Sequence, residues 1–420
     1  MILKRSNGQE IMTEDTPFAK GGEGSIYHIK TSRYKSSCVK LFHQGKLNSR
    51  KAKLDYMISH QLLAPINSQY RICWPSEYVY EGTNCVGFIM PLAFPESWSL
   101  YEIYLDDSND VFKRDEKVGI ENRYKLLYNI AQAINILHQS GYVLVDFKLQ
   151  NILCSNTGQI SMIDLDSIQI CENSNLLYPA TAYTIEYSYP KEIWKIGHDQ
   201  IISSHWDCYS FSIVAYQTLL GIHPFTASTD KTTPLGEHIS GLPDLMSNNL
   251  FPFGPRKADI YTYPPIQNYF HLLPEEIKSL FVRTFDISSN TPNMEDWLSA
   301  IYGVVNNEKA VENRFRSIPK PPIIIFDKPQ KTADGKYSIV NFICSYCDRI
   351  EYEGKLLQSD KPLLVENGVR EVLFIASNKF KRNVSYKLVL QTEPLYCITC
   401  GNKYDDPTDV YCTNCGTKRI

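Results

Sequence analysis

The sequence predicts an α+β protein in which a large mixed domain precedes a small all-β domain and a cysteine-rich C-terminal segment. The chain has 420 residues, too many for one ordinary core. Strand-like and helical patterns mix up to about residue 306, whereas only short strand-like runs follow residue 322. Several prolines in 307–322 disfavour helix and mark a linker between the two parts.

Composition favours a cytoplasmic protein without a membrane-spanning segment. Hydrophobic residues make up 43% of the chain, but no run approaches the ~18 uninterrupted apolar residues of a membrane span. The first residues contain no long apolar run, so we expect no signal peptide. The formal net charge of -3 gives no global attraction to nucleic acid. Six of the 12 cysteines are scattered singly, which is typical of a reducing compartment.

A glycine-rich segment near the N-terminus is a candidate phosphate-binding loop. Gly21, Gly22 and Gly24 follow Ala19, and the apolar Ile26 comes next. Glycines let a hairpin tip present backbone N–H groups to phosphate oxygens without a Cβ in the way. Taken alone, the segment also fits a plain glycine-rich hairpin.

Lys40 lies in a strand-like apolar run fourteen residues after Ile26. A lysine is costly to bury without a partner. Asp55 is the only acidic residue between His43 and Ser76, so we expect it to pair with Lys40. The alternative interpretation of Asp55 is a solvated charge on a helix.

A clear amphipathic helix, with apolar residues at three- and four-residue steps, precedes the most informative segment. That segment contains Asp146, Lys148 and Asn151, with four residues between the aspartate and the asparagine. Thirteen residues past Asn151 an apolar strand ends in Asp164, and Asp166 follows closely. Carboxylate and amide oxygens are the ligands that Mg²⁺ prefers.

The sequence resembles the eukaryotic-like Ser/Thr protein kinase family in the order and distances of four elements. These are the glycine-rich segment, Lys40, the segment from Asp146 to Asn151, and Asp164. The resemblance implies a bilobal protein-kinase fold for 1–306, with an N-lobe at about 1–92 and a C-lobe at about 93–306. It also implies ATP and Mg²⁺ (or Mn²⁺) as cofactors and a protein hydroxyl as the phosphate acceptor.

The kinase pattern implies a role for each of five residues. Lys40 would meet the α- and β-phosphates, Asp146 would orient the attacking hydroxyl, and Lys148 would contact the γ-phosphate. Asn151 and Asp164 would hold the metal. The nucleotide-binding positions implied by the resemblance are Gly21, Gly22, Gly24, Ile26, Lys40, Asp55, Met90, Pro91 and Ala93.

The acceptor class depends on two further features. An Asp-x4-Asn followed by Asp-x-Asp also fits small-molecule phosphotransferases, such as aminoglycoside and choline kinases. Those enzymes usually lack a lysine at the position of Lys148 and a helix that carries an aspartate like Asp207. In the kinase pattern Asp207 would tie the central C-lobe helix to the catalytic-loop backbone. Both features favour a protein substrate.

The sequence departs from the family at three places. Leu144 and Val145 replace His-Arg, and that arginine normally pairs with a phosphorylated activation loop, so we expect activity without loop phosphorylation. Leu165 and Asp166 replace Phe-Gly; Asp166 would approach a second metal or cap nearby N–H groups. Lys191 stands where the family has the glutamate of Ala-Pro-Glu.

The C-terminal segment carries two Cys-x-x-Cys pairs that resemble a zinc ribbon, Cys397 with Cys400 and Cys412 with Cys415. Four thiolates leave no open position, so the resemblance implies a structural Zn²⁺.

A third cysteine pair, Cys344 with Cys347, lies in the strand-like region. We expect these two thiols to pack in the β domain. The alternative places them on the zinc ion with Cys397 and Cys400.

The expected order is a kinase domain at 1–306, a linker at 307–322, a small immunoglobulin-like β-sandwich at 323–393 and a zinc ribbon at 394–420. This order resembles bacterial kinases found with a von Willebrand factor A domain protein and a metal-dependent protein phosphatase. The resemblance implies these two proteins as candidate partners or substrates. The C-terminal segment holds Lys403, Lys418 and Arg419 against three aspartates, so we expect no nucleic-acid partner. The alternative function is a pseudokinase-like scaffold that binds ATP without transfer.

Overall fold

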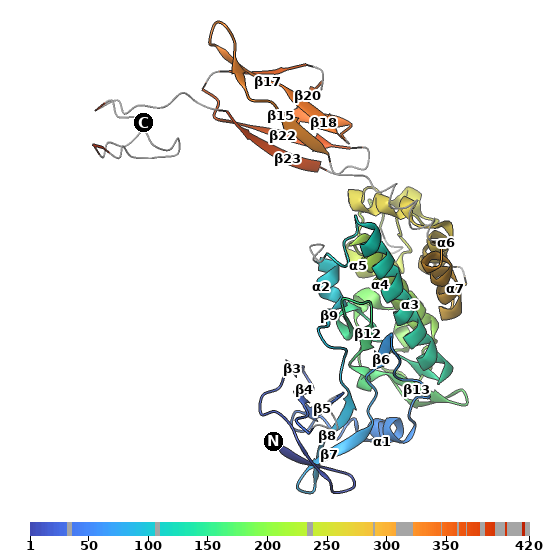
Figure 1. The fold of residues 1–420 in the computed structure, drawn as a ribbon. Helices are drawn as coiled ribbons and strands as arrows, with labels where there is room; N and C mark the ends of the chain where they lie inside the picture. The colour runs from blue at the N-terminus through green and yellow to red at the C-terminus, as the bar shows by residue number, and fades with distance from the viewer. Residues whose placement is uncertain are drawn as a thin grey trace. The chain divides into compact units, whose positions relative to one another are not determined.

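The chain forms two compact units, Met1–Ile318 and Pro319–Ile420 (Figure 1). The structure, a computed structural model, describes residues 1–31, 36–105, 110–232, 238–288, 290–307, 322–345, 347–358, 361–366, 368–378, 383–390, 400 and 414–415. In the described residues, no helix combines the length and the apolar character that crossing a bilayer requires.

The first unit begins with a seven-stranded antiparallel sheet in the order β2-β1-β7-β8-β5-β4-β3. Its strands are β1 (Ile2–Arg5), β2 (Glu10–Met12), β3 (Ala19–Lys20), β4 (Gly24–His28), β5 (Ser37–Phe42), β7 (Glu77–Glu81) and β8 (Asn84–Pro91). Val39 and Lys40 are adjacent in β5, so their side chains point to opposite faces of the sheet. Val39 joins a small apolar core, whereas Lys40 lines a cavity on the other face. The helix α1 (Lys51–Ser59) follows β5 in the chain (Figure 1).

A helical layer follows and surrounds one helix, α4, whose residues are buried from Trp206 to Leu220. The amphipathic pattern expected before the catalytic segment forms α3, which packs against α4 and α7. The helices are α2 (Leu100–Leu105), α3 (Lys117–Gln139), α4 (His205–Leu220), α5 (Gly241–Ser247), α6 (Glu275–Phe285) and α7 (Met294–Val305). The 3₁₀ helices are η2 (Leu149–Asn151), η3 (Leu165–Ser167), η4 (Ile185–Tyr187), η5 (Ile193–Lys195), η6 (Lys257–Asp259) and η7 (Pro265–Leu272).

Two small sheets position the segments between α3 and α4. One has the order β6-β12-β11-β9 and the other β10-β13-β14. Their strands are β6 (Tyr70–Ile72), β9 (Trp98–Ser99), β10 (Tyr142–Val143), β11 (Ile152–Cys154), β12 (Ile160–Met162), β13 (Gln169–Glu172) and β14 (Asn175–Tyr178). The hairpin β11–β12 connects Asn151 to Asp164, and the hairpin β13–β14 follows Asp166.

The second unit is all β in its described residues, as the sequence predicts for 323–393. Its three antiparallel sheets are β15-β18, β16-β17-β21 and β20-β19-β22-β23. Alternate side chains of β22 are buried, because one face of a strand covers a core. The strands are β15 (Ile323–Phe326), β16 (Gln330–Lys331), β17 (Tyr337–Val340), β18 (Phe342–Ser345), β19 (Arg349–Tyr352), β20 (Lys355–Leu357), β21 (Leu363–Glu366), β22 (Glu371–Ser377) and β23 (Asn383–Val389).

The cysteine predictions have different outcomes. Cys344 and Cys347 pack against the core of the β unit, and Cys347 Sγ lies 3.1 Å from the carbonyl oxygen of Arg349. Cys397 and Cys412 lie outside the described residues. Within the described part of the chain, no three His, Cys, Asp or Glu side chains form a group that could hold a metal ion.

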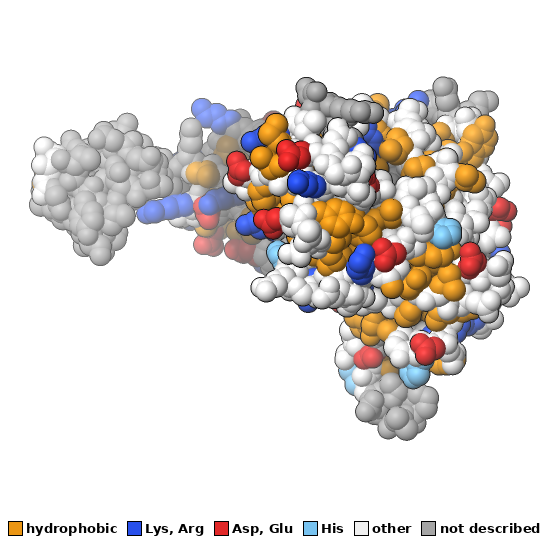
Figure 2. Space-filling model, turned by 90° about the horizontal axis from the view of Figure 1, so that it is seen from below, with side chains coloured by type: hydrophobic (Ala, Val, Ile, Leu, Met, Phe, Trp, Pro, Cys, Tyr) orange, Lys and Arg blue, Asp and Glu red, His pale blue; other side chains and the backbone are white. Residues whose placement is uncertain are grey.

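On the face shown in Figure 2, acidic and basic side chains are interspersed among hydrophobic ones. This view shows no extended patch of one sign, in keeping with the near-balanced charge of the sequence.

His223, just after α4, makes the stability of the first unit sensitive to pH. Its Nδ1 lies 3.3 Å from the backbone N–H of Phe225, which donates to it, and its Nε2 donates to the Glu186 carbonyl at 3.0 Å. This arrangement requires the neutral ring, and burial lowers the pKa of His223 from 6.5 to about 4.

We therefore expect the first unit to lose stability as pH falls from 6.5 to 4, because the unfolded chain binds the His223 proton more tightly. The loss at pH 4 should be on the order of 3 kcal/mol. His223→Gln keeps a donor but does not titrate, so its stability should fall less over the same range. Thermal unfolding of both proteins between pH 7 and pH 4 measures the difference; parallel curves would contradict this prediction.

Candidate active site

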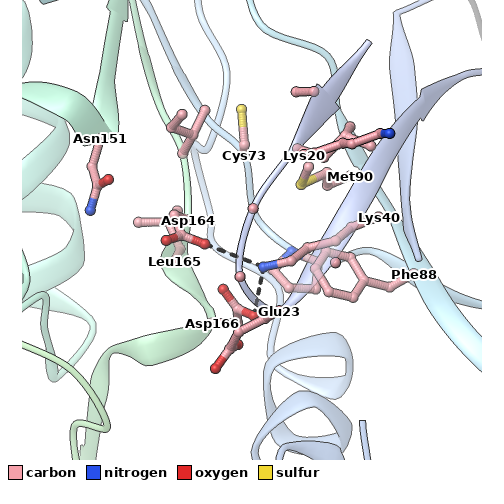
Figure 3. A pocket seen from close by; sticks show the side chains of 17 residues that line it. Lys20, Glu23, Lys40, Cys73, Phe88, Met90, Asn151, Asp164, Leu165 and Asp166 are labelled. Atoms are coloured by element: carbon pink, nitrogen blue, oxygen red, sulfur yellow. Dashed lines mark hydrogen bonds and ion pairs between the residues drawn. The ribbon is translucent and has the colours of Figure 1, made fainter. Parts of the chain in front are cut away.

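A cavity of about 250 Å³ in the first unit lies between the β3–β4 hairpin, β5, β8 and residues 163–166. Lys40 points into it from β5, opposite Asp164 and Asp166 (Figure 3). The predicted site residues that line the cavity are Gly21, Gly22, Gly24, Ile26, Lys40, Met90, Asn151 and Asp164.

The glycine-rich loop is the tip of the β3–β4 hairpin. Gly21 N–H donates to the Gly24 carbonyl at 2.9 Å and closes the turn. A Cβ on Gly24 would lie 2.4 Å from the backbone oxygen of Leu41, so the close approach of β5 requires glycine there. A Cβ on Gly22 would meet no atom within 4 Å, which leaves this part of the tip open.

The loop tip is attached to the segment between β5 and α1. Glu23, which also lines the cavity, forms an ion pair with Arg50 at the start of α1. His43 Nε2 lies 3.0 Å from the Gly21 carbonyl oxygen, and His43 N–H donates to the Glu23 carbonyl at 2.8 Å. These contacts hold the glycine-rich loop in position over the cavity.

Lys40 pairs with two aspartates that follow β12. Its Nζ lies 2.8 Å from Asp166 Oδ2 and 3.3 Å from Asp164 Oδ1. The Asp166 side chain is only 4% exposed, whereas that of Asp164 is 56% exposed. Burial disfavours both charges, but attraction between Lys40 and Asp166 holds the pKa of Asp166 below its ordinary value and that of Lys40 above it.

The structure does not bring Asp55 to Lys40, so the expected pair is wrong. The α1 helix turns Lys53, Leu54 and Met57 inward, and Asp55 falls on the outer face. Its carboxylate is 53% exposed and pairs with Lys51 at 3.2 Å. Asp166 supplies the buried carboxylate instead.

The loop before Asp146 is held by α4. Asp207 accepts hydrogen bonds from the backbone N–H groups of Leu144 at 2.7 Å and Val145 at 2.9 Å. Trp206 Nε1 donates to the Val145 carbonyl at 2.8 Å. Val145 has φ 64°, which a β-branched residue adopts only under constraint. The predicted link from Asp207 to this loop is confirmed, and it fixes the strained backbone beside Asp146.

Asp146 belongs to a closed network of side chains. Lys148 Nζ donates to Asp146 Oδ2 at 2.8 Å and to Thr184 Oγ1 at 2.9 Å. Thr184 Oγ1 donates to Asp146 Oδ1 at 2.6 Å, and Asn151 Nδ2 donates to the Asp146 carbonyl at 2.9 Å. Thr184 is not predicted from the sequence, because it lies 38 residues after Asp146 and belongs to no motif near it. The network fixes the orientation of the Asp146 carboxylate.

The donor set of the cavity fits a hard divalent cation. Asn151 and Asp164 both line the cavity, at the start and end of the β11–β12 hairpin. Because the Asn151 amide nitrogen is engaged with the Asp146 backbone, its side-chain oxygen is left to accept or to coordinate. Amide and carboxylate oxygens suit Mg²⁺.

Of the expected nucleotide-binding positions at and after the end of β8, only one is at the cavity. Met90 lines it, but Pro91 and Ala93, both described, do not. Pro91 is opposite Ser37 in the sheet, and the Ala93 carbonyl accepts a hydrogen bond from Arg71 Nη1 at 3.2 Å. These two residues therefore contact β5 and β6 outside the lining of the cavity.

Comparison with known proteins identifies this constellation. The sequence profile of the family described as "Protein kinase domain" matches residues 15–265, more than half of the chain. The chain belongs to the protein kinase family.

The kinase is also similar to individual protein kinases. It is 28% identical over 145 residues to serine/threonine-protein kinase PknA of Mycobacterium tuberculosis, covering 34% of this chain and 32% of PknA. It is 31% identical over 109 residues to citron rho-interacting kinase of Rattus norvegicus, covering 26% of this chain and 5% of that protein. The chain thus spans a third or less of these relatives' length.

In kinase terms, the segment from Asp164 onward is the activation segment. It forms the β13–β14 hairpin, and β13 pairs with β10 just before the catalytic loop. Asn173 and Ser174 both have positive φ, which closes a two-residue turn between the strands. Backbone pairing therefore orders this part of the kinase.

Replacing Asp166 should destabilise the kinase more than replacing Asp55. We expect Asp166→Asn to cost about 2–3 kcal/mol of folding stability, because it leaves the buried Lys40 ammonium with the single carboxylate of Asp164. Asp55→Asn removes only an exposed pair and should change stability by less than about 0.5 kcal/mol. Denaturant unfolding of both variants measures this, and equal effects would refute the assignment of Asp166 as the partner.

Proposed function

We propose that this protein is an ATP-dependent Ser/Thr protein kinase that transfers the γ-phosphate to a protein hydroxyl. The observation that carries this proposal is the fixed network of Asp146, Lys148 and Thr184 beside a cavity lined by Lys40 and Asp164. Similarity to Ser/Thr protein kinases supports it.

In the proposed reaction, Asp146 accepts the proton of the attacking hydroxyl as its oxygen forms a bond to the γ-phosphorus. The bond from the γ-phosphorus to the β–γ bridging oxygen breaks, and ADP leaves. Lys148 stabilises charge on the transferred group, and Lys40 orients the α- and β-phosphates. Asn151 and Asp164 would hold Mg²⁺, which neutralises charge on the phosphates when bound.

We further propose that transfer does not require phosphorylation of the activation segment. Val145 occupies the position of the arginine that would bind a loop phosphate, and its side chain is buried and uncharged. The β13–β14 hairpin supplies the order that such a phosphate would otherwise supply.

Labelling with radioactive Mg²⁺-ATP tests the activity and its independence together. Phosphatase-treated wild type, freed of phosphatase, should label itself or a generic protein substrate within twofold of untreated protein. Asp146→Ala and Asp164→Ala should lose at least about 100-fold, because each removes a group that acts in the transition state.

Each outcome of the labelling has a definite meaning. Equal labelling in all three proteins would exclude this site as its source. A requirement for prior phosphorylation would overturn the independence. MgATP binding without transfer to any substrate would instead favour the scaffold function.

For the C-terminal part, we propose an immunoglobulin-like domain at 323–393 and a zinc ribbon at 394–420. These modules would direct the kinase to a von Willebrand factor A domain protein and a protein phosphatase. One observation supports pairing of the two Cys-x-x-Cys segments: Asn414 Nδ2 lies 3.6 Å from Cys400 Sγ, which places the residue before Cys415 beside the first segment.

Metal analysis of the full chain tests the zinc ribbon. Purified protein should contain about one zinc ion per chain, and Cys400→Ser or Cys415→Ser should lower the content by at least half, since thiolates are the ligands. Cys344→Ser is the matched control and should retain zinc. Loss of zinc in Cys344→Ser would favour the alternative site, and absence of zinc in wild type would refute both.

A further inference from the structure

Lys53 is a buried lysine that the kinase pattern does not explain. It lies in the first turn of α1 and is only 6% exposed. Its Nζ donates to the carbonyl oxygens of Ile168 at 2.7 Å and Pro179 at 2.9 Å. Among the described residues, no carboxylate lies within ion-pairing distance of this ammonium group, so backbone carbonyls stabilise its charge.

The two carbonyls mark both ends of one hairpin in the activation segment. Ile168 directly precedes β13, and Pro179 directly follows β14. Lys53 therefore joins the two strands at their base and attaches them to α1. One turn further along α1, Tyr56 Oη donates to Glu172 at 3.4 Å, so the same face of the helix contacts the hairpin twice.

Each carbonyl is close in sequence to a different part of the proposed catalytic machinery. Ile168 lies two residues after Asp166, the buried partner of Lys40. Pro179 lies five residues before Thr184, which donates to Asp146. Lys53 thus holds the chain at two points. One lies just after Asp166, which pairs with Lys40, and the other lies just before Thr184, which contacts Asp146.

Burying the ammonium group of Lys53 has a free-energy cost. Burial disfavours the ammonium group, and together with the nearby charge of Arg50 it lowers the pKa of Lys53 to about 8. A methionine or leucine would fill the same interior position without that cost. The retained lysine provides two strong hydrogen bonds that no apolar side chain can make.

We propose that Lys53 is a positioning residue that holds the activation segment in its transfer-competent arrangement from α1. In this kinase the buried lysine–aspartate pair does not involve α1, and the two hydrogen bonds of Lys53 connect that helix to the base of the activation-segment hairpin. The proposal rests on the proposed kinase function, but the attachment itself can be measured without phosphate transfer.

The test compares Lys53→Met with Lys51→Met in the full chain. Lys51 is on the same helix, but its side chain is 47% exposed. We expect Lys53→Met to raise amide hydrogen exchange in 168–180 at least tenfold and to lower kcat at least tenfold, with the Kd for MgATP changed less than threefold. Lys51→Met should stay within twofold of wild type in all three measurements. Lys53→Arg, which retains N–H donors for the two carbonyls, should keep at least a third of the wild-type kcat.

Unchanged exchange in 168–180 for Lys53→Met, or changes equal to those of Lys51→Met, would overturn the proposal. If Lys53→Met raises exchange throughout the chain, that variant is destabilised as a whole, and the same measurements are made on Lys53→Gln instead. Extra exchange confined to 168–180 then supports the proposal, and extra exchange spread evenly over α1 and the sheet overturns it. If wild type transfers no phosphate, the kinase function fails, while the exchange data still decide whether Lys53 holds the hairpin.

Discussion

The buried ion pair between Lys40 and Asp166 is the contact on which the arrangement of this site depends. It joins β5 of the first sheet to the start of the activation segment, and it is closed from solvent on the aspartate side. A charge pair in such a setting is costly to break, because either partner left alone would be a buried, uncompensated charge. Lys40 and the segment 164–166 are therefore held together before any nucleotide enters.

This pair changes how the rest of the structure is connected. Because the carboxylate comes from the activation segment, α1 contributes cations to the site instead of an acid. Arg50 holds the tip of the glycine-rich loop through Glu23, and Lys53 holds the base of the β13–β14 hairpin. On the other side, Asp207 holds the strained catalytic-loop backbone from α4. Both sides of the cavity are thus attached to a helix.

Local patterns predicted much of this fold and site. The spacing from Asn151 to Asp164 is that of one hairpin, and pairing of its two strands brings these residues together. Short strand-like runs after residue 322 also predicted the all-β character of the second unit. Asp207 could be linked to the catalytic loop since the kinase pattern specifies that contact.

The errors and omissions share a physical cause, namely contacts between residues far apart in the chain. Proximity in the sequence predicts Asp55 as the partner of Lys40, but the rotation of α1 that packs Leu54 inward turns Asp55 to solvent. Asp166 follows Lys40 by 126 residues, and Thr184 follows Asp146 by 38. Periodicity and motif spacing carry no information about such pairs, which packing of the complete domain creates.

A double-mutant cycle between Lys40 and Asp166 tests the central claim most directly. The free energy of MgATP binding would be measured for wild type, Lys40→Met, Asp166→Asn and the double variant. If Asp166 acts by positioning Lys40, the double variant should bind no more weakly than Lys40→Met, with a coupling energy of at least about 1.5 kcal/mol. Losses that add within about 0.5 kcal/mol would show that the two residues act independently and would contradict the account.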